Sequence, residues 1–338
     1  MTHRASASDA GAIEHAAALI RAGRLVAFPT ETVYGLGARA DDREAVLRIF
    51  AAKGRPPTNP LIAHVPDAES ARALASEWPE AARALGAAFW PGPLTLVVKR
   101  RAGEGAIVDA CTAGGPTAAL RVPSHPIALA LLRAAGVSIA APSANRSTAI
   151  SPTTAEHVLK SLGDAVDLVL DGGPTGDPAA VSAFGIESTI VDVTRDPAVL
   201  LRPGAIPLAS LRAHAEVVDR GAQIVAEGER ATAPGAQARH YAPSARVVLL
   251  GEPSLAEEVE VHRARGERVG VIARARAPER VTGAHVEVLP ADPKGYAAAL
   301  YAALHRLEDA RCEVIVIAEV PADAAWLAVR DRLRRAAA

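Results

Sequence analysis

The chain has 338 residues, 50% of them apolar, and its 37 basic side chains are balanced by 38 acidic ones for a net charge of -1. This length predicts two globular domains, and the charge balance excludes a general attraction to polyanions such as nucleic acids. The two cysteines, Cys111 and Cys312, fit neither a disulfide framework nor a zinc site. We expect a cytoplasmic protein, because the start lacks the apolar core of a signal peptide and no apolar run approaches the ~20 residues that span a membrane.

The first part of the chain alternates between helical and strand patterns. Apolar residues at helical spacing predict helices over residues 9–22, 42–53, 125–135 and 154–162. Short apolar runs predict strands over residues 24–28, 61–65, 94–99, 118–122, 137–141, 168–170 and 188–193. This alternation predicts an α/β domain over residues 1–215, in which helices cover a twisted mixed sheet.

The pattern breaks over residues 216–245, which are rich in Gly, Pro and Ala and are predicted to form a linker. Beyond the linker, strand patterns cover residues 245–251, 268–273, 285–290 and 312–320, and helical patterns cover 254–265, 293–310 and 324–335. Their order predicts a smaller Rossmann-like C-terminal domain over residues 246–338. No G-x-G-x-x-G follows its first strand, which argues against a dinucleotide site there.

Polar segments follow several predicted strands of the first domain, the usual place for ligand sites in open α/β sheets. The first, residues 28–37, has glycines and hydroxyls that would let the backbone approach a ligand. In the second, residues 53–61, prolines stiffen a turn that carries Lys53, Arg55 and Asn59, and fixed donors of this kind suit phosphate because they lose little entropy on binding. A tight loop and a solvated basic turn are the alternative interpretations of these segments.

Two further segments carry chemistry. Arg121 lies within an otherwise apolar strand, where an unpaired charge is costly, so we expect a carboxylate partner from the protein or from a ligand. Residues 141–147 carry hydroxyls and an amide that would cap the next helix as readily as they would bind phosphate. No Walker loop occurs in the sequence, so ATP would have to be bound by another route.

Taken in chain order, these segments resemble the YrdC-like family, with its P-T-E-T-V-Y-G-L-G loop, K-G-R-P-x-x-N-P-L turn, R-V-P-S-H-P strand end and A-P-S-A-N loop. Residues 187–192 (ESTIVD) and 201–205 (LRPGA) extend the match. Residues 233–243 (APGAQARHYAP) resemble the linker signature S-P-G-x-x-x-x-H-Y-A-P of the longer members, although Ala233 replaces the serine and residues 236–238 replace bulkier, more basic ones. The chain is therefore identified as a member of the two-domain threonylcarbamoyl-AMP synthases.

The resemblance implies a nucleotidyltransferase that joins L-threonine, bicarbonate and ATP, with Mg2+, into threonylcarbamoyl-AMP and pyrophosphate for the t6A modification at position 37 of tRNA. A carbamate oxygen of the substrate would attack the α-phosphate, so no Ser-His-Asp or Cys-His arrangement is needed. Positioning and charge neutralisation would supply the catalysis. A tRNA threonylcarbamoyl transferase would receive the product, and the charge balance predicts weak or no direct binding of tRNA.

The resemblance also assigns site residues. Lys53 and Arg55 would be the catalytic cations, and Arg121 would pair with the carboxylate of threonine. Tyr241 would close the site from the linker, which would act as a lid that keeps water from the labile mixed anhydride. The remaining threonine-binding residues would be Thr32, His64, Ala141 and Ser188, and the ATP-binding residues would be Arg55, Asn59, Thr117, Ser143, Ser151, Arg202 and Tyr241. Without the motif, His64 would be interpreted as an ordinary histidine at a strand end, and no metal ligand can be identified.

Two other functions remain open at this stage. A concave, partly basic face would suit RNA binding, although stacking aromatics make up only 3% of the chain. Carbamoyl transfer in hydrogenase maturation also uses a YrdC-like domain, but those proteins carry C-x-x-C zinc motifs that this chain lacks.

Overall fold

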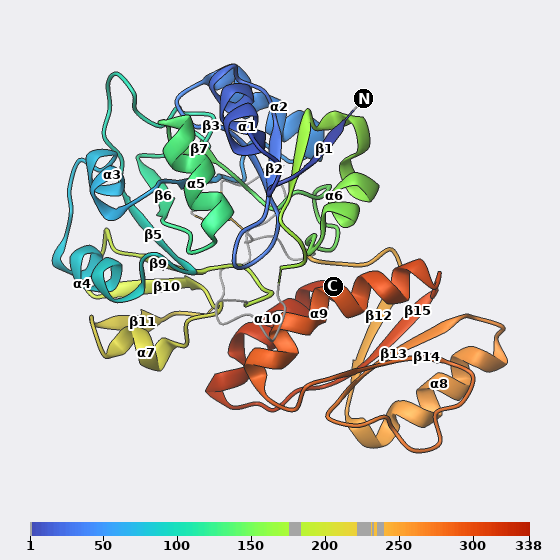
Figure 1. Ribbon diagram of the computed structural model, residues 1–338. Coiled ribbons are helices and arrows are strands. Elements are labelled where there is room, and N and C mark those ends of the chain that lie inside the picture. The colour runs from blue at the N-terminus through green and yellow to red at the C-terminus, as the bar shows by residue number, and fades with distance from the viewer. Residues whose placement is uncertain (1, 176–183, 222–230, 232, 235–239) are drawn as a thin grey trace.

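The computed structural model describes residues 2–175, 184–221, 231, 233–234 and 240–338. These residues form two bodies side by side, a larger one built from the first part of the chain and a smaller one at the C-terminal end (Figure 1). None of the helices in the described ranges has the length and apolar character needed to cross a membrane.

The larger body is built on a mixed sheet with the strand order β1-β8-β2-β3-β7-β4-β6-β5-β9-β10-β11. Parallel and antiparallel pairs both occur, for example β4 parallel to β6 and β5 antiparallel to β6. The strands are β1 (His3–Ser6), β2 (Val26–Phe28), β3 (Gly35–Arg39), β4 (Ile62–His64), β5 (Leu94–Lys99), β6 (Thr117–Arg121), β7 (Ile139–Ala140), β8 (Leu168–Asp171), β9 (Thr189–Asp192), β10 (Ala198–Arg202) and β11 (Val217–Asp219).

Helices cover both faces of this sheet because its strands are apolar on both sides. In β2, Val26 and Phe28 join the cluster under α1 and α5, whereas Ala27 faces the opposite cluster, which contains Val46 and Ile49 of α2. The helices are α1 (Ala12–Arg21), α2 (Arg43–Lys53), α3 (Ala68–Ala73), α4 (Glu80–Phe89), α5 (Pro126–Ala135), α6 (Ala155–Leu162) and α7 (Leu208–Arg212), with a 3-10 turn, η1 (Gly163–Ala165).

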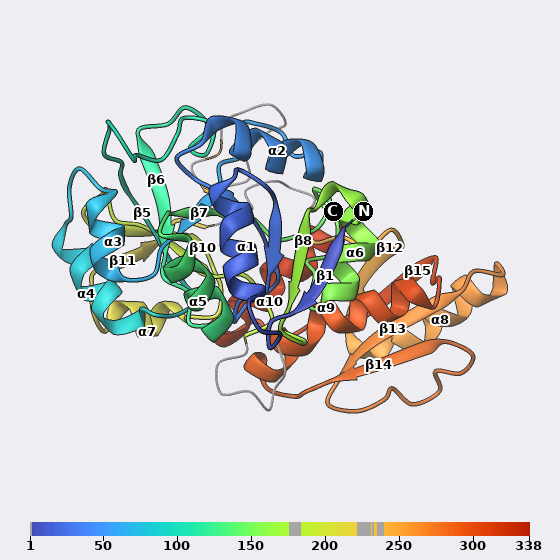
Figure 2. The ribbon, with the colours of Figure 1, turned by 45° about the horizontal axis from the view of Figure 1, so that its top comes forward.

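The smaller body is a parallel four-stranded sheet in the order β12-β15-β13-β14. Helix α8 packs on one face, and α9 and α10 pack on the other, between this sheet and the larger body (Figures 1 and 2). Its elements are β12 (Arg246–Leu250), η2 (Glu252–Ser254), α8 (Leu255–Ala264), β13 (Val269–Arg274), β14 (His285–Leu289), α9 (Pro293–Asp309), β15 (Val314–Ala318), η3 (Ala324–Trp326) and α10 (Leu327–Ala336).

The predicted fold class, a twisted mixed α/β sheet followed by a smaller Rossmann-like sheet, is confirmed. Several segments differ from the prediction, since β1, β10, α3, α4 and α7 were not predicted. The last three residues of the predicted loop over residues 28–37 belong to strand β3, where a side chain at Gly37 would collide with the ring of Phe28 at 2.7 Å. Strand β11 lies at the start of the predicted linker and pairs in parallel with β10, so the sheet continues a few residues into that segment.

The two bodies share one apolar core. Val33, Ile150 and Ile186 of the larger body and Tyr241 of the linker belong to the same cluster as buried side chains of α9 and α10. Burial of apolar surface between the bodies stabilises their contact, at roughly 25 cal/mol for each Å² removed from water. The second body is therefore packed against the first rather than tethered beside it.

Candidate active site

A cavity lies where several strands of the large sheet end. Because β4 and β6 run in parallel and pair His64 with Arg121, the two side chains come to the same edge of the sheet. Loops that follow β2 and β7 form further parts of the wall, together with Glu187 just before β9 and Arg202 at the end of β10, and residues of the linker cover the cavity. The lining residues are Thr30, Thr32, Val33, Gly35, Arg55, Ile62, His64, Arg121, Ala141, Pro142, Ser143, Glu187, Arg202, Pro234, His240 and Tyr241.

The buried charge of Arg121 has a carboxylate partner from the protein. Arg121 Nη2 donates to Glu31 Oε1 at 2.6 Å and to Thr32 Oγ1 at 3.1 Å, and all three side chains are buried. Arg121 Nε and Glu31 Oε2 have no hydrogen-bond partner among the described residues. Since Nε is still free to donate, the guanidinium can bind a second carboxylate while Glu31 fixes its orientation.

His64 is neutral in the folded protein. Burial, aided by the nearby Arg121 cation, lowers its pKa to about 3. Its Nδ1 has no hydrogen-bond partner among the described residues. A neutral imidazole beside a fixed cation can accept or donate a hydrogen bond without adding a charge to the pocket.

This burial is expected to make the free energy of unfolding depend on pH. Between the ordinary pKa of 6.5 and the folded value of about 3, the unfolded chain binds a proton that the folded chain does not, so stability falls as the pH falls. His64→Gln should therefore reduce the slope of the free energy of unfolding against pH by up to about 1.4 kcal/mol per pH unit between about pH 6 and pH 4. Urea unfolding measures this free energy. His15→Gln, at an exposed position of α1, is the matched control. An unchanged slope in His64→Gln would contradict the expectation.

Three buried cations surround the other side of the cavity, and each is held by neutral oxygens. Lys53 Nζ donates to the carbonyl of Ser143 at 2.5 Å and to that of Asn145, and Arg55 donates to Asn59 O at 3.0 Å and to Asn59 Oδ1 at 2.6 Å. Arg202 donates to the carbonyl of Ser188 at 2.9 Å and 3.1 Å.

These cations have no directly bonded carboxylate in the described part of the chain, although Glu187 acts on Arg202 at longer range. Within the described ranges, no ion pair joins Lys53, Arg55 or Arg202 to a carboxylate. Burial, aided by the neighbouring Arg55, lowers the pKa of Lys53, and burial lowers the pKa of Arg55 to about 10. A buried cation is costly unless an anion compensates it, so the arrangement favours a polyanionic ligand such as a nucleotide phosphate chain.

Most of the residues predicted for the site come together. Thr32, Arg55, His64, Arg121, Ala141, Ser143, Arg202 and Tyr241 line the cavity. Lys53, Asn59, Ser151 and Ser188 lie one contact behind it, bonded to Ser143, Arg55, Glu187 and Arg202 respectively. Thr117 does not line the cavity, because it begins β6, the strand that ends at Arg121. Linker residues 235–239 of the predicted signature lie outside the described residues.

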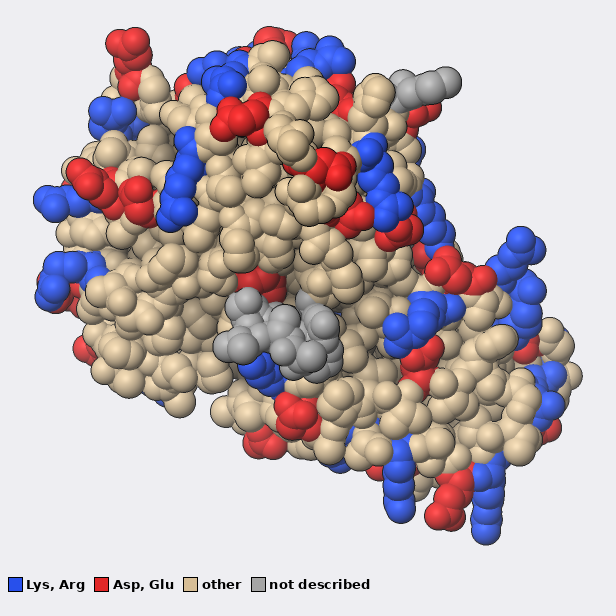
Figure 3. All heavy atoms as spheres, viewed as in Figure 1, with Lys and Arg blue, Asp and Glu red and all other residues tan. Residues whose placement is uncertain are grey.

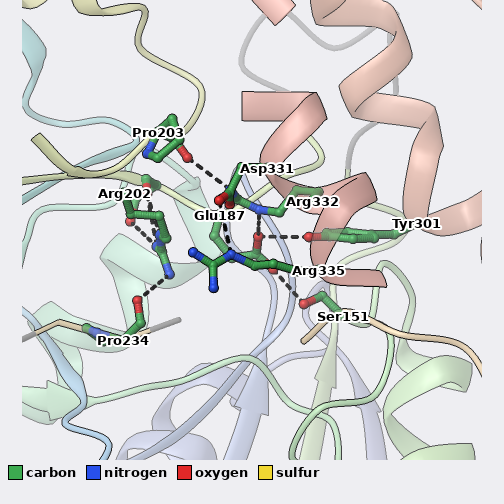
Figure 4. Close-up of polar contacts among 10 residues, drawn as sticks. Ser151, Glu187, Arg202, Pro203, Pro234, Tyr301, Asp331, Arg332 and Arg335 are labelled. Atoms are coloured by element: carbon green, nitrogen blue, oxygen red, sulfur yellow. Dashed lines mark hydrogen bonds and ion pairs between the residues drawn. The ribbon is translucent and has the colours of Figure 1, made fainter. Parts of the chain in front are cut away.

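The structure adds residues that the sequence analysis did not single out. Glu31 and Glu187 stand within the motifs of residues 28–37 and 187–192, and His240 precedes Tyr241 in the linker signature, so their positions were visible but their roles were not. Tyr301 and Arg332 come from the second domain and bond to Glu187 (Figure 4), and no sequence motif pointed to them.

The face shown in Figure 3 gives no support to the RNA-binding alternative. Lys and Arg side chains are interspersed there with Asp and Glu over both bodies, without a continuous basic patch. Binding of a nucleic acid backbone depends on such a patch. That alternative therefore gains nothing from this face.

Comparisons with known proteins cover the whole chain. Residues 18–204 match the family model of the Sua5, YciO and YrdC proteins, which is described as "Telomere recombination". Residues 206–338 match the model described as "Threonylcarbamoyl-AMP synthase, C-terminal domain".

Individual relatives agree with these matches. The threonylcarbamoyl-AMP synthase of Pyrococcus abyssi is 41% identical over 331 residues, which are 96% of this chain and 93% of the relative. That of Bacillus subtilis is 39% identical over 329 residues, covering 96% of this chain and 92% of the relative. The crystal structure of P. abyssi Sua5 complexed with L-threonine has a TM-score of 0.89 at 40% identity and covers 100% of this chain and 97% of that chain.

Proposed function

The chain belongs to the threonylcarbamoyl-AMP synthase family, and on that premise we propose that it joins L-threonine, bicarbonate and ATP into threonylcarbamoyl-AMP and pyrophosphate. Threonylcarbamoyl-AMP is the activated group for t6A synthesis at position 37 of tRNA. The resemblance found in the sequence motifs is thereby confirmed. The observation that carries the proposal is that two features occur at one cavity. One is Arg121, whose guanidinium is oriented by Glu31 and keeps a free Nε. The other is the set of three buried cations, Lys53, Arg55 and Arg202, that have no ion pair with a carboxylate among the described residues.

We assign the two sides of the cavity to the two substrates. Arg121, with Thr32 and His64 beside it, would hold the carboxylate and hydroxyl of threonine, helped by the backbone of Ala141 and by Ser188. Lys53, Arg55 and Arg202 would bind the phosphates of ATP, together with Asn59, Ser143, Ser151 and Tyr241, whereas the position of Thr117 outside the cavity removes it from this set. Fixed cations of this kind can stabilise charge that moves onto pyrophosphate as it leaves, without reorganising during the reaction.

In this scheme the chain acts by positioning. Bicarbonate would first condense with the amino group of threonine to a carbamate, with loss of one water. An oxygen of this carbamate would then attack the α-phosphorus, and the bond to pyrophosphate would break. Mg2+ would arrive with ATP and take its oxygen ligands from phosphates and water. In the described part of the chain, no group of three or more His, Cys, Asp or Glu residues is placed to hold a metal.

The linker would protect the product. Pro234, His240 and Tyr241 line the cavity from the linker side, and Tyr241 is buried in a left-handed conformation with φ of 60°. A cover of this kind would keep water from a labile mixed anhydride until it passes to a tRNA threonylcarbamoyl transferase in the cytoplasm.

The function is tested by measuring pyrophosphate release from ATP, Mg2+ and bicarbonate with L-threonine, with L-serine or without an amino acid. Release that depends on L-threonine supports the proposal. Release that is indifferent to the amino acid would keep an ATP site but refute the threonine pocket. No release under any of these conditions would overturn the proposed function and return weight to RNA binding, which a salt-dependent shift in tRNA mobility would reveal.

A further inference from the structure

Glu187 is a buried carboxylate in the cavity wall that connects the two domains (Figure 4). Its Oε1 accepts a hydrogen bond from Ser151 Oγ at 2.6 Å. Its Oε2 accepts from Tyr301 on α9 at 2.9 Å and from Arg332 Nε on α10 at 2.9 Å. The Glu187 side chain, which belongs to the first domain, is thus held by two residues of the second domain. It in turn accepts a hydrogen bond from Ser151, which is assigned to ATP.

Arg332 is held through its Nε and Nη1, while its Nη2 has no hydrogen-bond partner among the described residues. Its side chain has 0% exposure, and its Nη1 donates to the carbonyl of Pro203 at 3.0 Å and to Asp331 at 2.8 Å. Its guanidinium carbon lies 5.0 Å from the ring centroid of Tyr241, within cation–π distance. Arg332 therefore contacts three different segments around the cavity, through Glu187, Pro203 and Tyr241.

The charge of Arg332 matters as well as its shape. Burial raises the pKa of Glu187, but the Arg332 and Arg202 cations outweigh burial, so the pKa lies below its usual value and the carboxylate is ionised. An ionised carboxylate can accept the bonds from Ser151 and Tyr301 together with the bond from Arg332. Without Arg332, the buried carboxylate loses its directly bonded cation, and only the more distant Arg202 still acts on its charge.

A displacement of Glu187 would also move residues that are assigned to both substrates. Ser188 is the next residue, its hydroxyl lies 2.8 Å from Thr95 Oγ1, and its carbonyl and hydroxyl accept from Arg202. The hydroxyl of Ser151 donates directly to the Glu187 carboxylate. Glu187 therefore orients Ser188, which is assigned to threonine, through the peptide, and Ser151, which is assigned to ATP, through its side chain.

We propose that Arg332 is a positioning residue of the active site, supplied by the second domain, which holds Glu187 in the cavity wall and, through it, Ser188 and Ser151 directly behind the parts of the wall assigned to threonine and ATP. The inference rests on the proposed function. Arg332 does not line the cavity and acts through Glu187. The C-terminal domain is on this view a structural part of the active site.

The test uses the full chain with Arg332→Met, Arg332→Lys and the double variant Glu187→Gln/Arg332→Met, and with Arg334→Met, an exposed arginine of α10, as the matched control. Arg332→Met should raise KM for both L-threonine and ATP about 10-fold or more, because removal of one partner of a buried pair leaves an uncompensated charge. Arg332→Lys should recover part of the loss. The double variant, in which neither charge remains, should lie closer to the wild type than Arg332→Met does. Arg334→Met should match the wild type.

The outcomes separate positioning from mere stability. If Arg332 only stabilised the fold, its loss would reduce the amount of active protein and the apparent kcat and leave both KM values unchanged. Unchanged KM values, or a double variant no better than Arg332→Met, would overturn the inference.

Failure of the proposed function would look different, because the wild-type chain itself would then release no pyrophosphate with threonine. In that case, binding of L-threonine by calorimetry to the same variants decides the inference, since contacts of Ser188 do not require turnover. A wild-type chain that neither turns over nor binds threonine would overturn both the function and the inference.

Discussion

Arg121→Ala is expected to abolish threonine-dependent pyrophosphate release, with kcat/KM for L-threonine lowered at least about 100-fold. The buried guanidinium holds Glu31 and Thr32 through Nη2, and its Nε is still free to bind the carboxylate of the substrate. Without it, the Glu31 carboxylate is buried without a counter-charge, at a cost of about 3–5 kcal/mol, and faces a second carboxylate when threonine enters. The measurement is the pyrophosphate rate as a function of threonine concentration.

Two further variants test whether this result is specific to Arg121. Arg83→Ala removes an exposed arginine that pairs with Glu80 on α4, and it should leave the kinetics unchanged. Glu31→Gln/Arg121→Met removes both buried charges, so it should fold more stably than Arg121→Ala but still bind threonine poorly. If Arg121→Ala kept the wild-type KM for threonine, the assignment of this pocket would be wrong.

Deletion of residues 220–338 is expected to abolish productive synthesis. The deletion exposes Val33, Ile150 and Ile186, which are buried in one core with α9 and α10. Of the three hydrogen-bond partners that Glu187 has among the described residues, it removes two. It also removes Tyr241 from the wall of the cavity, which would admit water to the mixed anhydride. The measurement is the ratio of threonylcarbamoyl-AMP to AMP formed from ATP, together with the rate of pyrophosphate release.

Tyr241→Ala in the full chain separates the two causes of this loss. It keeps the second domain and the bonds of Arg332 and Tyr301 to Glu187, while it removes the cover of the cavity and the ring that contacts Arg332. We expect pyrophosphate release to continue with a raised KM for ATP, while the share of AMP rises through hydrolysis. Kinetics of the deletion that equal those of the full chain would refute both the cover and the role of the second domain.

The sequence by itself determined many of the regular elements, though not β1, β10, α3 or α4, and the location of the site along the chain. The helix at residues 42–53 was predicted with its ends because its signals are local, and in the structure Asp42 caps α2 through the amides of Glu44 and Ala45 while Gly54 ends it at a φ of 60°. Strand β5 coincides with the apolar run of residues 94–99. The polar segments were visible because each follows a strand, and their order along the chain was enough for the family.

Only the tertiary structure decided which charges meet. Arg121 and Glu31 are 90 residues apart in the chain, and Arg332 and Glu187 are 145 residues apart, so neither pairing leaves a local pattern. The sequence left open whether a carboxylate of the protein or of a ligand would reach Arg121, and it gave α10 no role in the site. Capping and periodicity depend on neighbours in sequence, whereas the partner of a buried charge depends on how whole domains pack.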